Sequence, residues 1–225
     1  MRDETCGIVL TGGRSSRFAG AVPPAGKAAL EIDGRSLVGR VLAALDAVAG
    51  RRIVVASPWQ SLPPLPEGVT IVRDTHDGAG PLAGLADGLR SLREEGTEVA
   101  AVVVLSCDVP LLSPGVLRML LDRLGRADGA ARPTWVVPEV AGHLEVLVSA
   151  LRPGLLPAIE AHLAAGRRDP RSLVERLRRD EPGSVAIVPE AQLRPVDPTL
   201  AGFRDVDTPG DLEELRRIAA SRPPT

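Results

Sequence analysis

The chain has 225 residues, of which 44% are hydrophobic and 25% are charged, and these proportions are those of an ordinary soluble globular protein. The length predicts one domain over residues 1–220 with a flexible tail at 221–225, and the composition excludes disordered, collagen-like and coiled-coil chains. A net charge of −2 and an aromatic content of 2% argue against a nucleic-acid-binding surface.

The N-terminal half of the chain alternates short apolar runs with segments of helical periodicity. The expected strands are 5–10, 52–56, 69–73 and 98–106, and the expected helices are 36–48 and 81–92. The last of these strands is a continuous, β-branched apolar run, which is typical of a central strand covered on both faces. The segment 58–68 is rich in proline, so we expect a surface connection there.

The C-terminal half continues this alternation. Ser113 is the expected N-cap of a helix that begins at Pro114 and reaches residue 124. The remaining expected strands are 135–137, 144–151 and 184–188, and the remaining expected helices are 153–165, 171–178 and 208–219. Strands that alternate with crossover helices predict an α/β protein with a mostly parallel sheet and helices on both faces.

The loops that follow parallel strands emerge on one edge of the sheet, where open α/β folds bind their ligands. In this chain those loops carry glycines, cations and carboxylates, namely Gly12, Gly13, Arg14, Ser15, Ser16, Arg17, Asp74, Asp77, Gly80, Asp108 and Asp207. We therefore expect the functional site at this edge.

The loop after the first strand has features of a phosphate-binding loop. The pair Gly12-Gly13 lets the backbone approach a bulky anion, and Arg17 and Lys27 would supply positive charge. The loop matches neither the Walker A motif nor GxGxxG. A tight turn with solvated arginines explains the glycine pair equally well.

Asp108 directly follows the central apolar strand, so its carboxylate is expected at the edge that binds ligands. Mg²⁺ is typically held by one or two carboxylates together with waters and substrate phosphates, which makes Asp108 a candidate metal ligand. A capping role for Asp108 is less attractive because Ser113 already caps the next helix. Asp74 also follows a strand, and an ordinary turn is an equal alternative for it.

Lys27 is the single lysine among 27 cationic residues, the other 26 being arginine. Such a bias indicates a coding preference for arginine, so a position that keeps lysine calls for a specific reason. A compact ammonium on a flexible stem binds phosphate as a point charge, in a geometry that the planar guanidinium of arginine does not reproduce.

The remaining reactive residue types show no pattern typical of chemistry. Cys6 and Cys107 are too few for a disulfide framework, and Cys107 is expected to be a small buried residue. The three histidines, His76, His143 and His162, have no metal-ligand spacing and are interpreted as surface or structural residues. Without a signal peptide or a long apolar segment, we expect a cytoplasmic protein.

Five stretches, in order, give the chain a family resemblance. They are LTGGRSSRF with its following lysine and AALEIDGRSLVGRVLAAL, VRDTHDGAGPLAGLADGL, VVLSCDVPLL, HLEVLVSALRPGLLPAIEAHLAAGRR and FRDVDTPGDLEEL. This ordered set resembles the nucleotidyltransferases of the Rossmann-like, three-layer α/β/α nucleotide-diphosphosugar-transferase fold. Within them it looks most like the molybdenum cofactor guanylyltransferases.

The resemblance implies a reaction and a set of site residues. GTP and the molybdopterin form of the molybdenum cofactor would give the guanine dinucleotide cofactor and pyrophosphate, with Mg²⁺ as the metal. The residues implied are Leu10, Thr11, Gly12 and Gly13 for the nucleotide, Lys27 for phosphate, Asp74 for the guanosine part and Asp108 for the metal. In such a reaction we expect Arg17 to help Lys27 stabilise the departing pyrophosphate. Transient contact with biosynthesis or acceptor proteins is also implied, and no contact with nucleic acid or membrane.

The chain departs from the family pattern in two places. The connection FAGAVPPAG between Arg17 and Lys27 is longer than usual, and Gly26 stands where an aspartate is expected. Asp205 and Asp207 replace residues that are commonly asparagine, in a chain that has no asparagine at all. Two alternatives stay open: a cytidylyl- or guanylyltransferase for another phosphorylated acceptor, and a non-catalytic nucleotide-binding relative.

Overall fold

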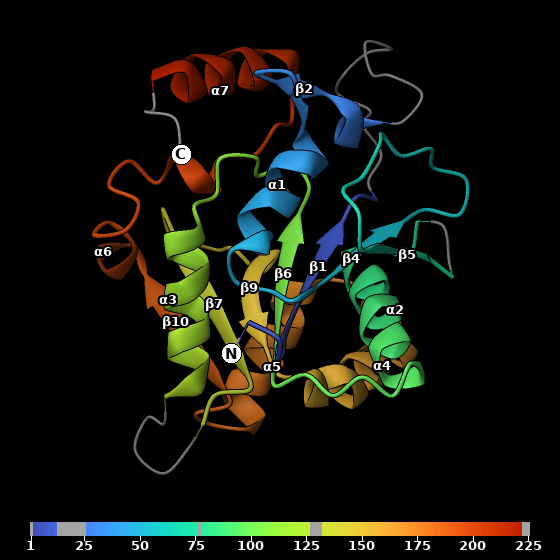
Figure 1. Ribbon diagram of the computed structural model, residues 1–225. Helices are drawn as coiled ribbons and strands as arrows, with labels where there is room; N and C mark the ends of the chain where they lie inside the picture. The colour runs from blue at the N-terminus through green and yellow to red at the C-terminus, as the bar shows by residue number, and fades with distance from the viewer. Residues whose placement is uncertain (1, 13–25, 76–77, 127–131, 222–225) are drawn as a thin grey trace.

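Figure 1 shows the computed structural model of the chain, which describes residues 2–12, 26–75, 78–126 and 132–221. The strands are β1 (Thr5–Leu10), β2 (Glu31–Ile32), β3 (Arg35–Ser36), β4 (Arg51–Ala56), β5 (Val69–Arg73), β6 (Ala101–Ser106), β7 (Trp135–Val140), β8 (His143–Leu144), β9 (Val148–Leu151) and β10 (Val185–Pro189). The helices are α1 (Leu37–Asp46), α2 (Pro81–Glu94), α3 (Pro114–Gly125), α4 (Leu156–Ala164), α5 (Pro170–Asp180), α6 (Glu190–Leu193) and α7 (Pro209–Ser221). Short 3-10 turns occupy Lys27–Ala29, Pro153–Leu155 and Ala201–Phe203.

The central sheet has the strand order β10-β7-β9-β6-β1-β4-β5, with β8 paired to β7. The pairs β1–β4, β1–β6, β4–β5 and β10–β7 are parallel, whereas β9 runs antiparallel to both of its neighbours. Leu10 lies beside Ser106 at the carboxyl ends of β1 and β6. The expected mostly parallel α/β sheet is therefore confirmed.

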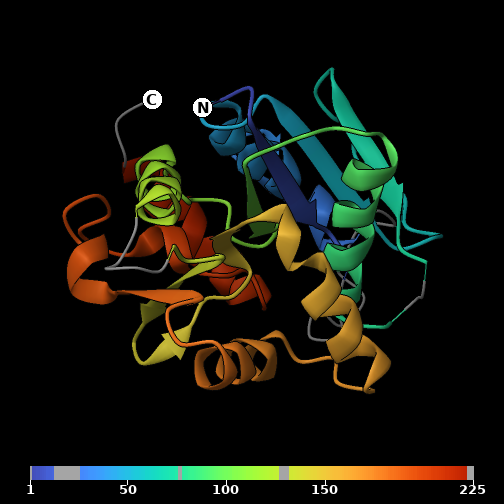
Figure 2. The same ribbon diagram turned by 90° about the horizontal axis from the view of Figure 1, so that it is seen from below.

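Helices cover both faces of this sheet because successive strand residues point to opposite sides. On one face, Val9 and Val103 belong to an apolar cluster with α1 and α3. On the other face, Ile8 and Val104 belong to a cluster with α2, α4 and α5. Figure 2 shows α4 and α5 on the side of the sheet opposite to α3. The result is a three-layer α/β/α architecture.

The hairpin β2–β3 and helix α7 come from opposite ends of the chain and lie side by side (Figure 1). Ile32 and Leu37 share a separate apolar cluster with Val206, Leu212 and Leu215. This cluster fixes the segment after Lys27 against the C-terminal part of the chain. It therefore brings together two stretches that carry candidate site residues.

The structure corrects several sequence-based expectations. The single strand expected over 144–151 is interrupted, because the Val148 amide donates to the Glu145 carbonyl and turns the chain between β8 and β9. The strand expected from residue 98 begins at Ala101. The hairpin β2–β3 and helix α6 were not expected, since each is too short to show a periodic pattern.

One exclusion based on the sequence can be examined directly. Among the described residues, no helix combines the length and the apolar character needed to cross a lipid bilayer.

Candidate functional site

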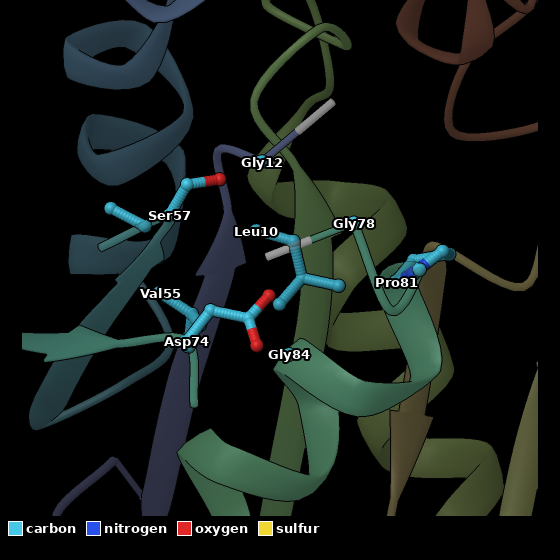
Figure 3. Close-up of a pocket in the computed structure, with 10 residues that line it drawn as sticks. Leu10, Gly12, Val55, Ser57, Asp74, Gly78, Pro81 and Gly84 are labelled. Carbon is cyan, nitrogen blue, oxygen red and sulfur yellow. The ribbon is translucent and has the colours of Figure 1, made fainter. Parts of the chain in front are cut away.

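A cavity of about 590 Å³ lies at the carboxyl edge of the sheet, between β1, β4, β5 and the start of α2. Its walls include Leu10, Gly12, Ser57, Asp74 and Gly84 (Figure 3). Such a volume falls within the range of about 300–1,000 Å³ that is usual for small-molecule sites. The cavity therefore lies where the parallel strands predict ligand binding.

Among the described residues that line this cavity, Asp74 is the acidic one. Its amide donates to the Ala56 carbonyl at 2.9 Å, which fixes the residue at the end of β5. Figure 3 shows its carboxylate facing Gly84 and the side chain of Leu10. A Cβ at Gly84 would lie 3.5 Å from Val55 and 3.9 Å from the Oδ2 atom of Asp74. Glycine at this position therefore keeps the surroundings of the carboxylate open.

The end of β1 is tied to the loop after β4. The amide and the hydroxyl of Thr11 each donate to the Val55 carbonyl at 2.9 Å. The side-chain amide of Gln60 donates to the Thr11 carbonyl at 3.2 Å, and its oxygen lies 3.2 Å from the Thr11 hydroxyl. These contacts hold Thr11 and the exposed Gly12 in one backbone position.

A second group of residues surrounds the ammonium of Lys27. Its Nζ atom donates to Oδ1 of Asp207 at 2.7 Å, across 180 positions of the sequence. Burial raises the pKa values of the Asp108 and Asp205 carboxyls, and the positive charge of Lys27 opposes this rise. The structure thus brings four carboxylates into the electrostatic range of the single lysine, those of Asp108, Asp205, Asp207 and Asp211.

Asp108 is the most buried of these carboxylates. Burial raises the pKa of its carboxyl, and the negative charge of Asp205 adds to this rise. A hydrogen bond with the Ser106 side chain and the charge of Lys27 oppose it. The Asp108 carbonyl accepts from the Val206 amide at 2.9 Å, so the segment with Asp205 and Asp207 is pinned to Asp108.

Glu145 belongs to the same electrostatic environment. Burial raises the pKa of its carboxyl, Arg171 lowers it, and the charges of Asp205 and Asp108 raise it further. Carboxylates whose charged forms are disfavoured by burial and by one another are stabilised by an added cation. This part of the site is therefore suited to a divalent cation, although the described residues contain no group of three or more side chains that could enclose one.

The cavity and the charged group occupy neighbouring strand ends. The amide of Cys107 donates to the Leu10 carbonyl at 3.0 Å, which joins the strand that leads to Asp108 to the strand that leads to Gly12. A ligand that spans both places would meet Asp74 at one end and Lys27 and Asp108 at the other.

The other residues singled out in the sequence have different outcomes. Gly13, Arg17 and His76 lie outside the described residues. Cys107 is buried, as expected, and burial raises the pKa of its thiol. His162 is likewise buried, in accord with a structural role.

Sequence reasoning missed three residues that contribute to the site. Ser57 directly follows β4, so the rule that selected Asp74 and Asp108 would have selected it too. Gln60 lies within the proline-rich connection, where only a surface loop was expected. Glu145 lies in the turn that was predicted to be strand, and no local signal marks it.

Comparisons with known proteins place the whole chain in context. The profile of a family described as "MobA-like NTP transferase domain" matches residues 7–201. A molybdenum cofactor guanylyltransferase from Desulfosudis oleivorans is 30% identical over 212 residues, covering 94% of each chain. A probable molybdenum cofactor guanylyltransferase from Pelotomaculum thermopropionicum is 28% identical over 216 residues, covering 96% of this chain and 94% of that protein.

Solved structures share the fold. Molybdopterin-guanine dinucleotide biosynthesis protein A from Archaeoglobus fulgidus has a TM-score of 0.71 at 22% identity, covering 96% of this chain and 100% of its own. The 2-C-methyl-D-erythritol 4-phosphate cytidylyltransferase from Thermus thermophilus has a TM-score of 0.66 at 21% identity, covering 95% of this chain and 98% of its own. The architecture is that of nucleotidyltransferases.

Proposed function

This chain belongs to the MobA-like NTP transferase family, and from that premise we propose that it transfers GMP from GTP to the molybdopterin form of the molybdenum cofactor. The products would be the guanine dinucleotide cofactor and pyrophosphate. The observation that carries the proposal is the grouping of Lys27, Asp108, Asp205 and Asp207 beside the cavity that holds Asp74. The choice of substrates is supported by relatives at 28–30% identity that are molybdenum cofactor guanylyltransferases or probable ones.

The nucleoside end of GTP would occupy the cavity. Leu10 and Gly12 line this cavity and would contact the nucleotide, together with Thr11 between them, and Asp74 would accept hydrogen bonds from the guanosine part. Gly12 is exposed, so its backbone is accessible to a phosphate. We extend the proposal to Gly13 and Arg17, which follow in the same loop, on sequence grounds alone.

The phosphates would lie toward the charged group. A terminal phosphate oxygen of the acceptor forms a bond to the α-phosphorus of GTP, while the bond from that phosphorus to the β-phosphate oxygen breaks and pyrophosphate leaves. Lys27 would neutralise the charge that develops on the leaving pyrophosphate, helped by Arg17. Because the ammonium already lies 2.7 Å from Asp207, its position is set before the nucleotide binds.

Asp108 is the residue that would hold Mg²⁺. When bound, the ion would reduce the negative charge of the substrate phosphates. Members of this family are nucleotidyltransferases that typically use a divalent metal. A single protein carboxylate is sufficient when substrate phosphates and water complete the coordination shell. Asp205 and Glu145 would increase the negative potential that attracts the cation.

The choice of GTP over CTP rests on the guanylyltransferase relatives, because the fold itself is shared with a cytidylyltransferase. A different phosphorylated acceptor is the main competing function. Both questions are settled by supplying GTP or CTP with the molybdopterin cofactor, or with a sugar phosphate, and measuring the release of pyrophosphate.

The experiment compares two carboxylate variants in that assay. Asp108→Asn should lose Mg²⁺-dependent turnover by about 10²–10³-fold, the usual effect of removing one electrostatic contact in a transition state. Asp122→Asn on α3 is the matched control, because that carboxylate is exposed and belongs to another surface. Near-normal turnover by the Asp108 variant would contradict the proposed role.

A further inference from the structure

We infer that Asp87, a carboxylate on α2 outside the catalytic group, is a positioning residue that fixes Asp74 and thereby sets the preference for the nucleotide base. The inference rests on the proposed function, because it assumes that Asp74 contacts the nucleoside. It concerns the selectivity of that site.

The start of α2 and the loop before it form a wall between two cavities. Asp74, Gly80 and Gly84 face the nucleotide cavity. Thr75 and Asp87 face a second cavity of about 690 Å³, which lies between this wall and α4. Asp74 and Thr75 are adjacent in the chain but face different cavities. A contact that fixes Thr75 therefore also restricts the position of Asp74.

Asp87 holds the far side of this wall by several contacts. It is 5% exposed, although it is an acidic residue in the middle of a helix. Its Oδ2 atom accepts from the Thr75 amide at 2.8 Å and from the Thr75 hydroxyl at 3.0 Å. Its Oδ1 atom accepts from Nη1 of Arg90 at 2.5 Å. Both carboxylate oxygens are therefore engaged.

These contacts reach Asp74 through the backbone. The amide of Asp74 is bound to the Ala56 carbonyl, and the next amide along the chain, that of Thr75, is bound to Asp87. Asp74 consequently lies between two fixed peptide units, one anchored to β4 and the other to α2. Removing the Asp87 carboxylate would remove the second of these anchors.

A contribution to the stability of the fold does not by itself explain why the charged Asp87 carboxylate is buried. Replacing a buried ion pair by apolar residues of similar size is often neutral or stabilising, so such pairs are weak contributors to stability. The partner that Asp87 binds twice is the residue next to Asp74. The geometry therefore points to placement of Asp74 as the role of this carboxylate.

The same network supplies a matched control. Arg90 also donates from Nε and Nη2 to Oε1 of Glu160 on α4, at 3.2 and 3.0 Å. Glu160→Gln weakens the Arg90 ion pair and leaves the contacts between Asp87 and Thr75 in place. Asp87→Ala removes those contacts. Thr75→Ala removes only the hydroxyl contact and is a milder second variant if Asp87→Ala fails to fold.

The test measures dissociation constants of the folded variants for GTP and CTP in Mg²⁺, together with exchange of the Thr75 amide proton. In Asp87→Ala we expect the GTP-over-CTP preference to fall by roughly tenfold and the Thr75 amide to exchange faster. Thr75→Ala should lose about threefold in preference, and the double variant should be no worse than Asp87→Ala, because both act through one contact. Glu160→Gln should keep both properties within about twofold.

The possible failures are distinguishable. If the wild-type protein prefers GTP and Asp87→Ala keeps that preference to the same degree as Glu160→Gln, the inference is wrong and the proposed function stands. If the wild-type protein binds neither nucleotide, the proposed function is wrong and the inference falls with it.

Discussion

Lys27 links the unusual composition of the chain to the chemistry of its site. Arginine serves at 26 of the 27 cationic positions, yet lysine is kept at the position whose ammonium lies 2.7 Å from Asp207 and within electrostatic range of Asp108. A planar guanidinium with five donors would impose a different geometry on the same carboxylates and on a phosphate. The one cationic position that keeps lysine therefore belongs to the charged group of the site.

Replacing Lys27 by arginine tests this interpretation. Lys27→Arg keeps the charge but should lower turnover by about 10²-fold, because the phosphate contact depends on the compact ammonium. The reciprocal change Arg118→Lys, at an exposed position of α3, should leave turnover unaffected. The assay is pyrophosphate release at saturating GTP, and an active Lys27→Arg enzyme would contradict the assignment.

His162 gives a prediction at the residue scale that is independent of catalysis. It is 1% exposed, and its Nε2 atom lies 3.0 Å from the Ser172 hydroxyl. Burial lowers the pKa of its imidazole, and the positive charges of Arg176 and Arg167 lower it further. The folded protein therefore disfavours the protonated ring.

The sign of the resulting pH dependence follows from linkage. Below a pH of about 6.5 the unfolded chain protonates this histidine while the folded protein resists, so stability falls as the pH falls, by at most about 1.4 kcal/mol for each pH unit. His162→Gln should flatten this slope in urea unfolding between pH 7 and 5, whereas the same change at the exposed His143 should not. Equal slopes in the wild type and His162→Gln would refute the argument.

At the scale of elements, the packing of α2 against β1 and β4 positions the wall of the nucleotide cavity. Gly88 permits this approach, because a Cβ there would lie 3.0 Å from Cδ1 of Ile8 and 3.2 Å from Cγ2 of Val55. Ile8 and Val55 belong to the same apolar cluster as the buried face of α2. Larger side chains would push the helix away from the sheet.

Gly88→Val should lower the free energy of unfolding by about 1–3 kcal/mol, the usual cost of overpacking a core. It should also weaken GTP binding, since α2 carries Gly84 at the cavity. Gly125→Val at the end of α3 is the control, because among the described residues nothing lies within 4 Å of the Cβ position there. Urea unfolding and nucleotide titration of both variants make the comparison, and equal stabilities would contradict the packing argument.

Elements with a long periodic pattern were predictable from sequence. The strands β1 and β5 have the predicted bounds, and Ser113 caps α3 as expected, with the Val116 amide donating to its hydroxyl. The turn at Glu145 was not predicted, because one glutamate among apolar residues is also compatible with a continuous strand, and the separate pairing of β8 and β9 with β7 arises only in the folded chain. An element can be predicted from local sequence when burial of one face determines its pattern. It cannot be predicted when its bounds depend on pairing with a strand elsewhere in the chain.

Only some residues of the site, like only some of the elements, could be predicted from the sequence. The rule that loops after parallel strands share one edge predicted Asp74 and Asp108 at the carboxyl edge of the sheet, and in the structure they follow β5 and β6 there. Their roles in binding stay predictions. The rule could not reveal that Asp207 pairs with Lys27, because their 180-residue separation is closed only by folding. Nor could it reveal Asp87, whose position in a helix gives no sign of its contact with Thr75.

At the scale of the whole molecule, the charged group depends on contact between the two ends of the chain. The guanidinium of Arg216 on α7 donates twice to the Glu31 carbonyl of β2, at 2.9 and 3.1 Å. Together with the apolar cluster between the hairpin and α7, this contact holds the segment of Lys27 against the segment of Asp207. A ligand that binds across this contact should stabilise the entire fold.

Binding of GTP and Mg²⁺ together should therefore raise the unfolding temperature of the wild-type protein. A ligand at a hundred times its dissociation constant adds about 2.7 kcal/mol to the free energy of unfolding. In Asp108→Asn the part of the shift that depends on Mg²⁺ should disappear, which thermal unfolding with and without a chelator would measure. A shift independent of Mg²⁺ in the wild type would contradict the metal role of Asp108.

The most direct test of the account is to follow the α-phosphate of GTP. The wild-type protein is incubated with the molybdopterin cofactor, Mg²⁺ and equal concentrations of GTP and CTP, and the products are identified by mass spectrometry. We predict a guanine dinucleotide that retains the α-phosphate of GTP, formed in equal amount with pyrophosphate and absent without the cofactor. A cytosine dinucleotide as the main product, or no product that depends on the cofactor, would contradict the proposed function.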